Sequence, residues 1–156
     1  MIDRSLLRAA LLDALQAEFD LQVRAAQLAR DEATNEESRA EGKYDTRAQE
    51  AAYLAEGQAR VASDLQLSLS LYRDLTFPAP ADPIAVGHLV QLGDDEAHIY
   101  LLGPKSGGLE ITVDGHQILV VTPASPLGRQ LLGARLGATV TLPGRPARSL
   151  PIRRLW

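Results

Sequence analysis

The stretch "AQEAAYLAEGQARVASDLQLSLSLY", residues 48–72, decides the fold of the N-terminal half. Its seam residues recur every three or four positions, which is the spacing of a helix that packs one side against a partner. Seven of the eight seam positions are apolar and Gln58 is the eighth; the apolar ones are Ala48, Ala51, Ala55, Ala62, Leu65, Leu69 and Tyr72. The stretch therefore predicts a long helix with one apolar seam.

A second helix-forming segment, residues 5–32, precedes this helix and contains neither glycine nor proline. Its apolar positions follow similar spacing, interrupted by Gln22, and include Leu12, Leu15, Phe19, Ala26 and Ala29. Two such helices joined by a short tip form an antiparallel hairpin, and a helix of this length extends about 42 Å at roughly 1.5 Å per residue. We therefore expect a coiled-coil hairpin over residues 1–75. One arm of an ordinary helical bundle is the alternative.

The segment "TFPAPADP", residues 76–83, contains three prolines and ends the second helix. Beyond it the apolar period changes to two, from Val86 to Leu92, which is typical of a strand. Further strand-like runs are bounded by glycine, proline or aspartate and cover residues 97–102, 109–113, 117–121, 138–142 and 149–155. One short helix is expected over 126–132, with Ser125 as its N-cap. The fold class is therefore α+β, with a small sheet domain over 84–156.

The net charge of −4 is unevenly distributed along the chain. Residues 1–75 carry 14 acidic and 9 basic residues, whereas no acid follows Asp114. Six arginines occupy that last part: Arg129, Arg135, Arg145, Arg148, Arg153 and Arg154. An asymmetric field orients a protein toward a charged partner, so these arginines are candidates for a partner-facing surface. A dipolar surface without consequence is the alternative.

Several function classes find no support in the sequence. The chain has no cysteine, no apolar run of the roughly 18 residues that a membrane span needs, and no export-signal pattern at its start, so we expect a cytoplasmic protein. The loop "GPKSGG", residues 103–108, lacks a glycine that a phosphate loop requires. The three histidines lack a short metal-ligand spacing, and Ser125 does not lie in a nucleophile elbow. Nothing therefore indicates a hydrolytic enzyme.

Carboxylates are concentrated between the two expected helices. Seven lie within residues 31–50: Asp31, Glu32, Glu36, Glu37, Glu41, Asp45 and Glu50. One interpretation is a solvated turn with capping residues, because Thr34 to Glu37 and Ser38 to Glu41 both match the S/T-x-x-E capping box. The other is a ligand set, because carboxylate oxygens suit Mg²⁺, which proteins often hold with one or two carboxylates plus substrate phosphates.

The segment "SPLGRQLLGARLG", residues 125–137, resembles the S-P-L-G-x-x-L-L-G-x-x-x-G signature of the bacterial transcript-cleavage (Gre) elongation factors. The segments "VGHLVQLG" (86–93) and "IYLLGP" (99–104) and the total length also fit this family, so the resemblance covers essentially the whole chain. It implies an N-terminal coiled-coil hairpin with an acidic tip near 31–45, a linker over 76–83 and an FKBP-like domain over 84–156. The regulator-of-nucleoside-diphosphate-kinase family shares the C-terminal signature but has a shorter hairpin.

The resemblance also implies a function. In this family the hairpin enters the secondary channel of RNA polymerase, and two tip acids help to place a second Mg²⁺, so that the polymerase hydrolyses the 3′ end of the nascent, backtracked RNA. The factor itself would not be an enzyme. We expect a monomer whose Mg²⁺ is shared with the polymerase active site and is not bound to the free protein.

The family's tip reads approximately G-D-L-S-E-N-A-E-Y, and ungapped alignment sets it against "EESRAEGKY", residues 36–44. Glu37 falls on the aspartate position, whereas Ala40 occupies the place of the second acid and Glu41 is its neighbour. Glu37 and Glu41 are therefore the candidate catalytic and Mg²⁺-binding residues, since residues four apart share one face of a helix. A relative with an altered tip can instead occupy the channel and modulate or inhibit the polymerase without cleavage.

FKBP-like domains include prolyl isomerases, whose pockets are lined by aromatic side chains. From residue 84 onward this sequence has only Tyr100 and Trp156. We therefore expect no prolyl isomerase activity.

Overall fold

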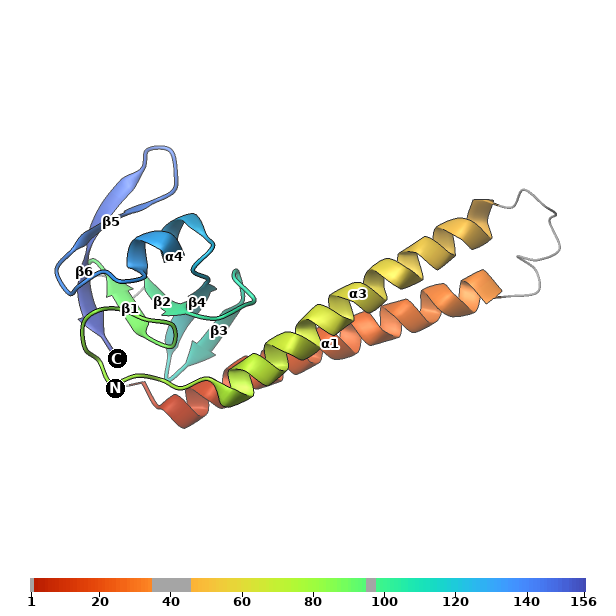
Figure 1. Ribbon diagram of the computed structural model, residues 1–156, viewed down its shortest axis with the longest axis horizontal. Helices are drawn as coiled ribbons and strands as arrows, with labels where there is room; N and C mark the ends of the chain where they lie inside the picture. Colours follow the sequence, from red (N-terminus) through yellow and green to blue (C-terminus); the bar gives the residue numbers. More distant parts are fainter. Residues whose placement is uncertain (1, 35–45, 95–97) are drawn as a thin grey trace. The chain divides into compact units, whose positions relative to one another are not determined.

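The computed structural model describes residues 2–34, 46–94 and 98–156 (Figure 1). The chain divides into two compact units. The hairpin unit is Asp13–Leu69, and the sheet unit combines Met1–Leu12 with Ser70–Trp156. The two long helices, α1 (Arg4–Thr34) and α3 (Thr46–Asp74), contribute residues to both units.

In the hairpin unit, α1 and α3 run antiparallel alongside each other (Figure 1), which confirms both predicted helices. The predicted seam of α3 is buried wherever its side chains are described, apart from the half-buried Gln58. Its buried residues in this unit are Ala55, Ala62, Leu65 and Leu69, and α1 contributes Leu15 and Ala29. Burial of these positions follows from the three- and four-residue spacing, which places them on one side of each helix.

The predicted seam of α1 is only partly buried: Leu15 and Ala29 are buried, whereas Leu12, Phe19 and Ala26 are half-buried. Next to Leu12, Leu11 is fully buried in the sheet unit, and so is Leu7. The sequence offers two adjacent leucines at this point, and both fit an apolar spacing. In the structure the fully buried leucines are spaced four residues apart, at Leu7 and Leu11. Side chains spaced by four form one of the two kinds of ridge through which helices pack.

The sheet unit contains a mixed six-stranded sheet in the order β3-β4-β2-β1-β6-β5. Its strands are β1 (Leu89–Leu92), β2 (Ile99–Leu102), β3 (Glu110–Val113), β4 (His116–Val121), β5 (Thr139–Leu142) and β6 (Arg148–Leu155). Only the β2–β4 pair is parallel, and the other neighbours pair antiparallel. Every strand overlaps a predicted run, so the α+β fold class is confirmed.

The strand predicted from Val86 to Leu92 is shorter in the structure. All four residues of β1 are buried, and the strand begins only at Leu89. Gly87 adopts a φ of +98°, and a Cβ there would lie 2.3 Å from the carbonyl oxygen of Thr76. This glycine turns the chain before β1, and the central position of β1 in the sheet buries both of its faces.

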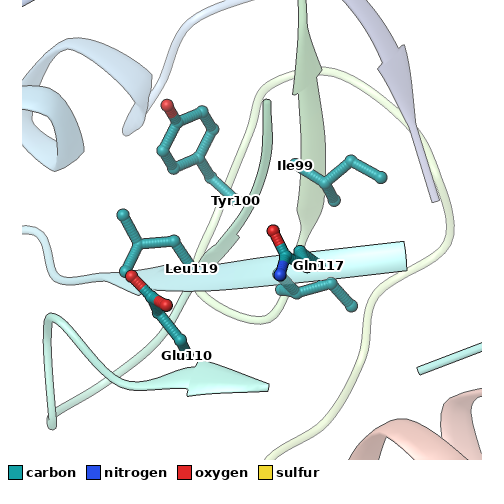
Figure 2. Close-up of a pocket in the computed structure, with 6 residues that line it drawn as sticks. Ile99, Tyr100, Glu110, Gln117 and Leu119 are labelled. Atoms are coloured by element: carbon teal, nitrogen blue, oxygen red, sulfur yellow. The ribbon is translucent and has the colours of Figure 1, made fainter. Parts of the chain in front are cut away.

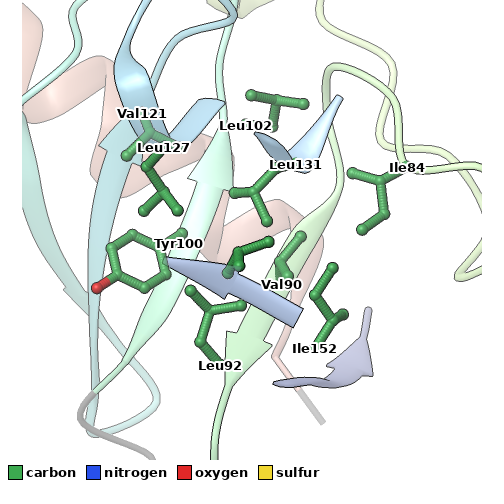
Figure 3. Packing of buried hydrophobic residues seen from close by; sticks show 10 residues of the cluster. Ile84, Val90, Leu92, Tyr100, Leu102, Val121, Leu127, Leu131 and Ile152 are labelled. Carbon is green, nitrogen blue, oxygen red and sulfur yellow. The ribbon is translucent and has the colours of Figure 1, made fainter. Parts of the chain in front are cut away.

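One face of the sheet packs against the short helix α4 (Pro126–Leu131) and forms the core shown in Figure 3. The ten buried residues of this cluster are Ile84, Val90, Leu92, Tyr100, Leu102, Val121, Leu127, Leu131, Val140 and Ile152. Alternate residues of the inner strands, Leu89, Leu101, Ile118 and Val120, are buried as well. Tyr72, near the end of α3, lies on that second side, because a Cβ on Gly103 would contact both Tyr72 and Val120.

The signature segment 125–137 is held by its backbone geometry. Ser125 caps α4, as predicted: its hydroxyl accepts a 3.0 Å hydrogen bond from the amide of Gly128. A Cβ on Gly128 would lie 1.9 Å from the carbonyl oxygen of Thr122, so only glycine fits. Gly133 and Gly137 have φ values of +79° and +87°, which favour glycine. These residues of the signature therefore support the fold.

Candidate functional site

The predicted site residues Glu37 and Glu41 lie outside the described residues, and so do Glu36 and Asp45. Their roles in catalysis and in Mg²⁺ binding stay predictions. The structure describes the two helices that border this segment: α1 ends at Thr34 and α3 begins at Thr46. The remaining acids of the cluster, Asp31, Glu32 and Glu50, are described and exposed.

Asp31 and Glu32 lie in the last turn of α1, which contains no basic residue. The C-terminus of a helix carries a partial negative charge, so each acid there costs about 0.3–1 kcal/mol of helix stability at an exposed position. The first turn of α3, where acids would be favourable, contains none. These two acids are therefore not explained as helix caps. Asp31 accepts a 2.7 Å hydrogen bond from the side-chain amide of Gln27, one turn earlier in α1.

Thr34 is the last residue of α1, and its hydroxyl lies 3.0 Å from the carbonyl oxygen of Arg30 and 3.2 Å from that of Asp31. A threonine hydroxyl often donates back in this way to the preceding turn of its own helix. Glu37, the partner of Thr34 in the first predicted capping box, lies outside the described residues, and so does the whole second box, Ser38 to Glu41. Both capping boxes therefore stay predictions.

A groove of about 290 Å³ lies between the two helices of the hairpin unit. Its α1 side is formed mainly by Phe19, Val23 and Ala26, and its α3 side includes Ala59 and Ala62. Small alanine side chains leave this space open because they cannot fill the gap between two helices. The groove can accept an apolar side chain of a partner, and it contains no acid or histidine for acid–base chemistry.

Two arginines at the start of α1 cap the C-terminal end of α3 within the sheet unit. The Arg8 guanidinium donates to the carbonyl oxygens of Tyr72, Arg73 and Leu75, and it stacks over the Phe77 ring at 5.1 Å. Arg4 donates to the carbonyl oxygens of Phe77 and Pro78, at 3.1 and 2.7 Å. Cations at a helix C-terminus satisfy its free carbonyl groups. These positioning residues were not predicted from the sequence, although two arginines four apart on a helix are a visible signal.

The motifs set aside in the sequence have structural roles. His88 is buried, and its two ring nitrogens lie 2.9 Å from the amide of Ala85 and from the carbonyl oxygen of Ala79. Residues 103–108 form a loop in which the Gly108 amide bonds to the carbonyl oxygen of Val120. Within residues 2–34, 46–94 and 98–156 no cluster of three acids or histidines could hold a metal, and no helix is long and apolar enough to cross a membrane.

A small pocket of about 150 Å³ opens on β2, β3 and β4 (Figure 2). Tyr100 is its one aromatic side chain, and Glu110 and Gln117 supply its polar groups. Burial raises the pKa of the Tyr100 hydroxyl, and the positive charge of Arg148 partly offsets that rise. The absence of prolyl isomerase activity stays a prediction.

No protein-family model matches the chain, and no curated protein matches it with significance. Among solved structures, the chain is similar to GreA factor homolog 1 (Gfh1) of Thermus thermophilus, at 16% identity and a TM-score of 0.35, over 94% of this chain and 95% of that one. It is also similar to a second structure, described as the transcription factor Gfh1, at 20% identity and a TM-score of 0.38, over 94% and 93% of the two chains. TM-scores this low do not assign the chain to a family.

Proposed function

We propose that this protein regulates RNA polymerase by entering its secondary channel and stimulates cleavage of backtracked RNA through its hairpin carboxylates. The observation that carries the proposal is the position of the acidic segment. It joins two helices of 31 and 29 residues, and its first two acids occupy a helix end that disfavours them. The resemblance of residues 125–137 to the Gre signature supports the choice of polymerase as the partner.

The donor chemistry of this segment suits the proposed role. Glutamate carboxylates are hard oxygen ligands, and Mg²⁺ accepts such ligands together with phosphate oxygens. A second metal ion in a phosphodiester site activates water and stabilises the charge on the leaving group. Glu37 and Glu41 are the proposed ligands of an ion shared with the polymerase. The protein would supply oxygen atoms to an active site that belongs to its partner, and it would not be an enzyme by itself.

A second candidate function is regulation without cleavage. Ala40 stands where the Gre tip has its second acid, and Arg39, Lys43 and Arg47 alternate with the remaining acids. Basic side chains at these positions can neutralise the carboxylates or contact RNA phosphates. A protein with this tip would occupy the channel and alter polymerase activity without positioning a metal ion.

A backtracked polymerase complex with labelled RNA and Mg²⁺ separates these candidates. We expect the wild-type protein to shorten the RNA from its 3′ end and the Glu37→Ala/Glu41→Ala variant to lose this effect while still binding polymerase. The matched control is Asp13→Asn/Glu18→Gln, which removes two exposed acids from the hairpin unit outside the acidic segment. This control should cleave like the wild type.

Three other outcomes have distinct meanings. Polymerase binding without RNA shortening by the wild type supports the second candidate. Equal loss of cleavage in the control shows that total charge matters more than the acidic segment. Absence of polymerase binding by the wild type contradicts both candidates.

A further inference from the structure

The end of the chain is rich in arginine and free of acid. Residues 115–156 contain six arginines and one histidine, with no lysine, aspartate or glutamate. Four of the arginines lie on β5, β6 or the residues between them, a segment called here the β5–β6 ribbon (139–155). They are Arg145, Arg148, Arg153 and Arg154, and all four are exposed. This part of the sheet unit therefore concentrates positive charge that no acid within it balances.

The ribbon has one apolar and one polar face. Val140 pairs with Leu150 and faces the core, whereas the neighbouring pair, Thr141 and Ser149, points the other way. Thr139 alternates to the same outer face, and the Thr141 and Ser149 hydroxyls lie 3.3 Å apart. Thr139, Thr141 and Ser149 are exposed, and so are residues 143–147 between the strands. Figure 1 shows the ribbon at the edge of the sheet.

Contacts within the protein leave most of this positive charge available. Arg153 pairs with Asp94 at 2.9 Å, but the two side chains are 53% and 84% exposed, so this pair contributes little and is easily exchanged. Arg154 lies over the Trp156 ring at 5.4 Å and keeps its charge. Among the described residues, Arg145 and Arg148 form no ion pair with an acid.

The exposed side chains of the ribbon favour phosphate, although Arg148 alternates with Ser149 and therefore lies on the side opposite to the hydroxyls. The planar guanidinium group binds phosphate oxygens in a bidentate way, which lysine cannot do. Serine and threonine hydroxyls are common additional donors to the phosphodiester backbone. A protein partner would instead need an apolar anchor at the centre of its interface. None of the large exposed apolar side chains of the described residues lies within 139–155.

The composition of the ribbon favours a duplex over a single strand. Proteins that bind single strands stack the bases on aromatic side chains. The ribbon contains no aromatic residue; Tyr100 is buried in the core, and the Trp156 ring is covered by Arg154. The major groove of duplex DNA, about 12 Å wide, admits a two-stranded β-ribbon. Contacts would then reach phosphates without reading bases.

We propose that the β5–β6 ribbon binds the phosphodiester backbone of duplex nucleic acid without sequence preference, through the exposed guanidinium groups of Arg145 and Arg148. This binding goes beyond the proposed action on polymerase and does not depend on it. The acidic segment between α1 and α3 takes no part in it.

Fluorescence anisotropy with a labelled 30-base-pair DNA duplex tests the proposal. The full-length protein should bind with a dissociation constant of about 10⁻⁴ to 10⁻⁶ M, and its affinity should fall as salt rises. In the Arg145→Gln/Arg148→Gln variant the slope of log affinity against log salt should be shallower by about 2, since each phosphate contact contributes about 0.9. A single-stranded RNA of equal length should bind more weakly than the duplex.

The matched control is Arg24→Gln/Arg60→Gln, which removes two exposed charges from the hairpin unit. It should leave duplex binding unchanged, and thermal unfolding should show that both double variants remain folded. An absence of duplex binding at 50 mM salt would overturn the proposal, as would an unchanged slope in the Arg145→Gln/Arg148→Gln variant or an equal effect of the control. If this variant loses affinity for nucleic-acid-free polymerase while DNA does not bind, the ribbon recognises an acidic protein surface and the proposal is wrong.

Discussion

The hydroxyl of Tyr72, near the end of α3, donates a 2.7 Å hydrogen bond to the carbonyl oxygen of Lys105 in the loop between β2 and β3. Tyr72 is fully buried. Gly103 makes room for it, because a Cβ at that position would lie 2.2 Å from the Tyr72 hydroxyl. This bond joins the helix end to the sheet inside the sheet unit, and its strength can be measured.

Replacing Tyr72 with phenylalanine should destabilise the protein. The variant keeps the ring but loses the buried hydrogen bond to Lys105, which costs about 1–2 kcal/mol. Urea unfolding gives the change in the free energy of unfolding. Tyr53→Phe is the control, because Tyr53 is 75% exposed and should tolerate the change. Equal stability of Tyr72→Phe and the wild type would contradict the assigned role of this bond.

Stability should also fall at alkaline pH because of the same residue. Burial raises the pKa of Tyr72 above its ordinary value, and the hydrogen bond to Lys105 only partly offsets this rise. Above about pH 10 the unfolded state loses the tyrosine proton while the folded state keeps it, so the free energy of unfolding decreases as pH rises. Urea unfolding between pH 8 and 11 should show a shallower decrease for Tyr72→Phe than for the wild type. Parallel pH profiles would show that Tyr72 does not cause the loss.

Gly57→Ala should stabilise the hairpin by about 1 kcal/mol, the usual difference between the two residues inside a helix. Gly57 is exposed in α3, and a Cβ there would meet no described atom within 4 Å. Gly128→Ala is the opposite case, because its Cβ would lie 1.9 Å from the carbonyl oxygen of Thr122. The midpoint temperature of thermal unfolding should therefore rise for Gly57→Ala and fall for Gly128→Ala. A lower midpoint temperature for Gly57→Ala would contradict this prediction.

Neutralising Asp31 and Glu32 should stabilise α1 and reduce function at the same time. The Asp31→Asn/Glu32→Gln variant removes two charges from a helix C-terminus, a gain of about 0.5–2 kcal/mol for the pair. If the acids serve the proposed cleavage, RNA shortening should decrease in the same variant. Circular dichroism melting and the cleavage assay measure the two effects. A gain in stability with unchanged cleavage would limit the functional carboxylates to the segment between the helices.

Gln130 protects the open edge of the sheet. Its side-chain amide accepts a 2.8 Å hydrogen bond from the Thr141 amide and donates a 3.0 Å bond to the Thr141 carbonyl oxygen, as a neighbouring strand would. Gln130→Ala should lower the free energy of unfolding by about 1–2 kcal/mol and expose the β5 edge to other chains. The Gln130→Glu side chain can only accept a hydrogen bond, so the free energy of unfolding of this variant should lie between those of the wild type and Gln130→Ala. Unfolding and light scattering measure these effects, and a monodisperse, fully stable Gln130→Ala protein would contradict this role.

Local patterns in the sequence determined the two long helices and the capped helix α4. The seam of α3 is a three- and four-residue repeat, and Ser125 lies within three residues of the amide that it caps, so each signal is complete in a short window. The sequence also located the carboxylates, and its resemblance to the Gre factors led to Glu37 and Glu41. These two assignments remain predictions, because the residues lie outside the described structure.

Only the tertiary structure decided which of two adjacent leucines, Leu11 or Leu12, is fully buried and where β1 begins. It also decided that Arg8 caps a helix whose end lies more than 60 positions further along the chain. Such choices depend on the free energy of contacts between segments that are distant in the chain. A local pattern fixes which side of an element is apolar, but it does not fix which distant surface that side will meet.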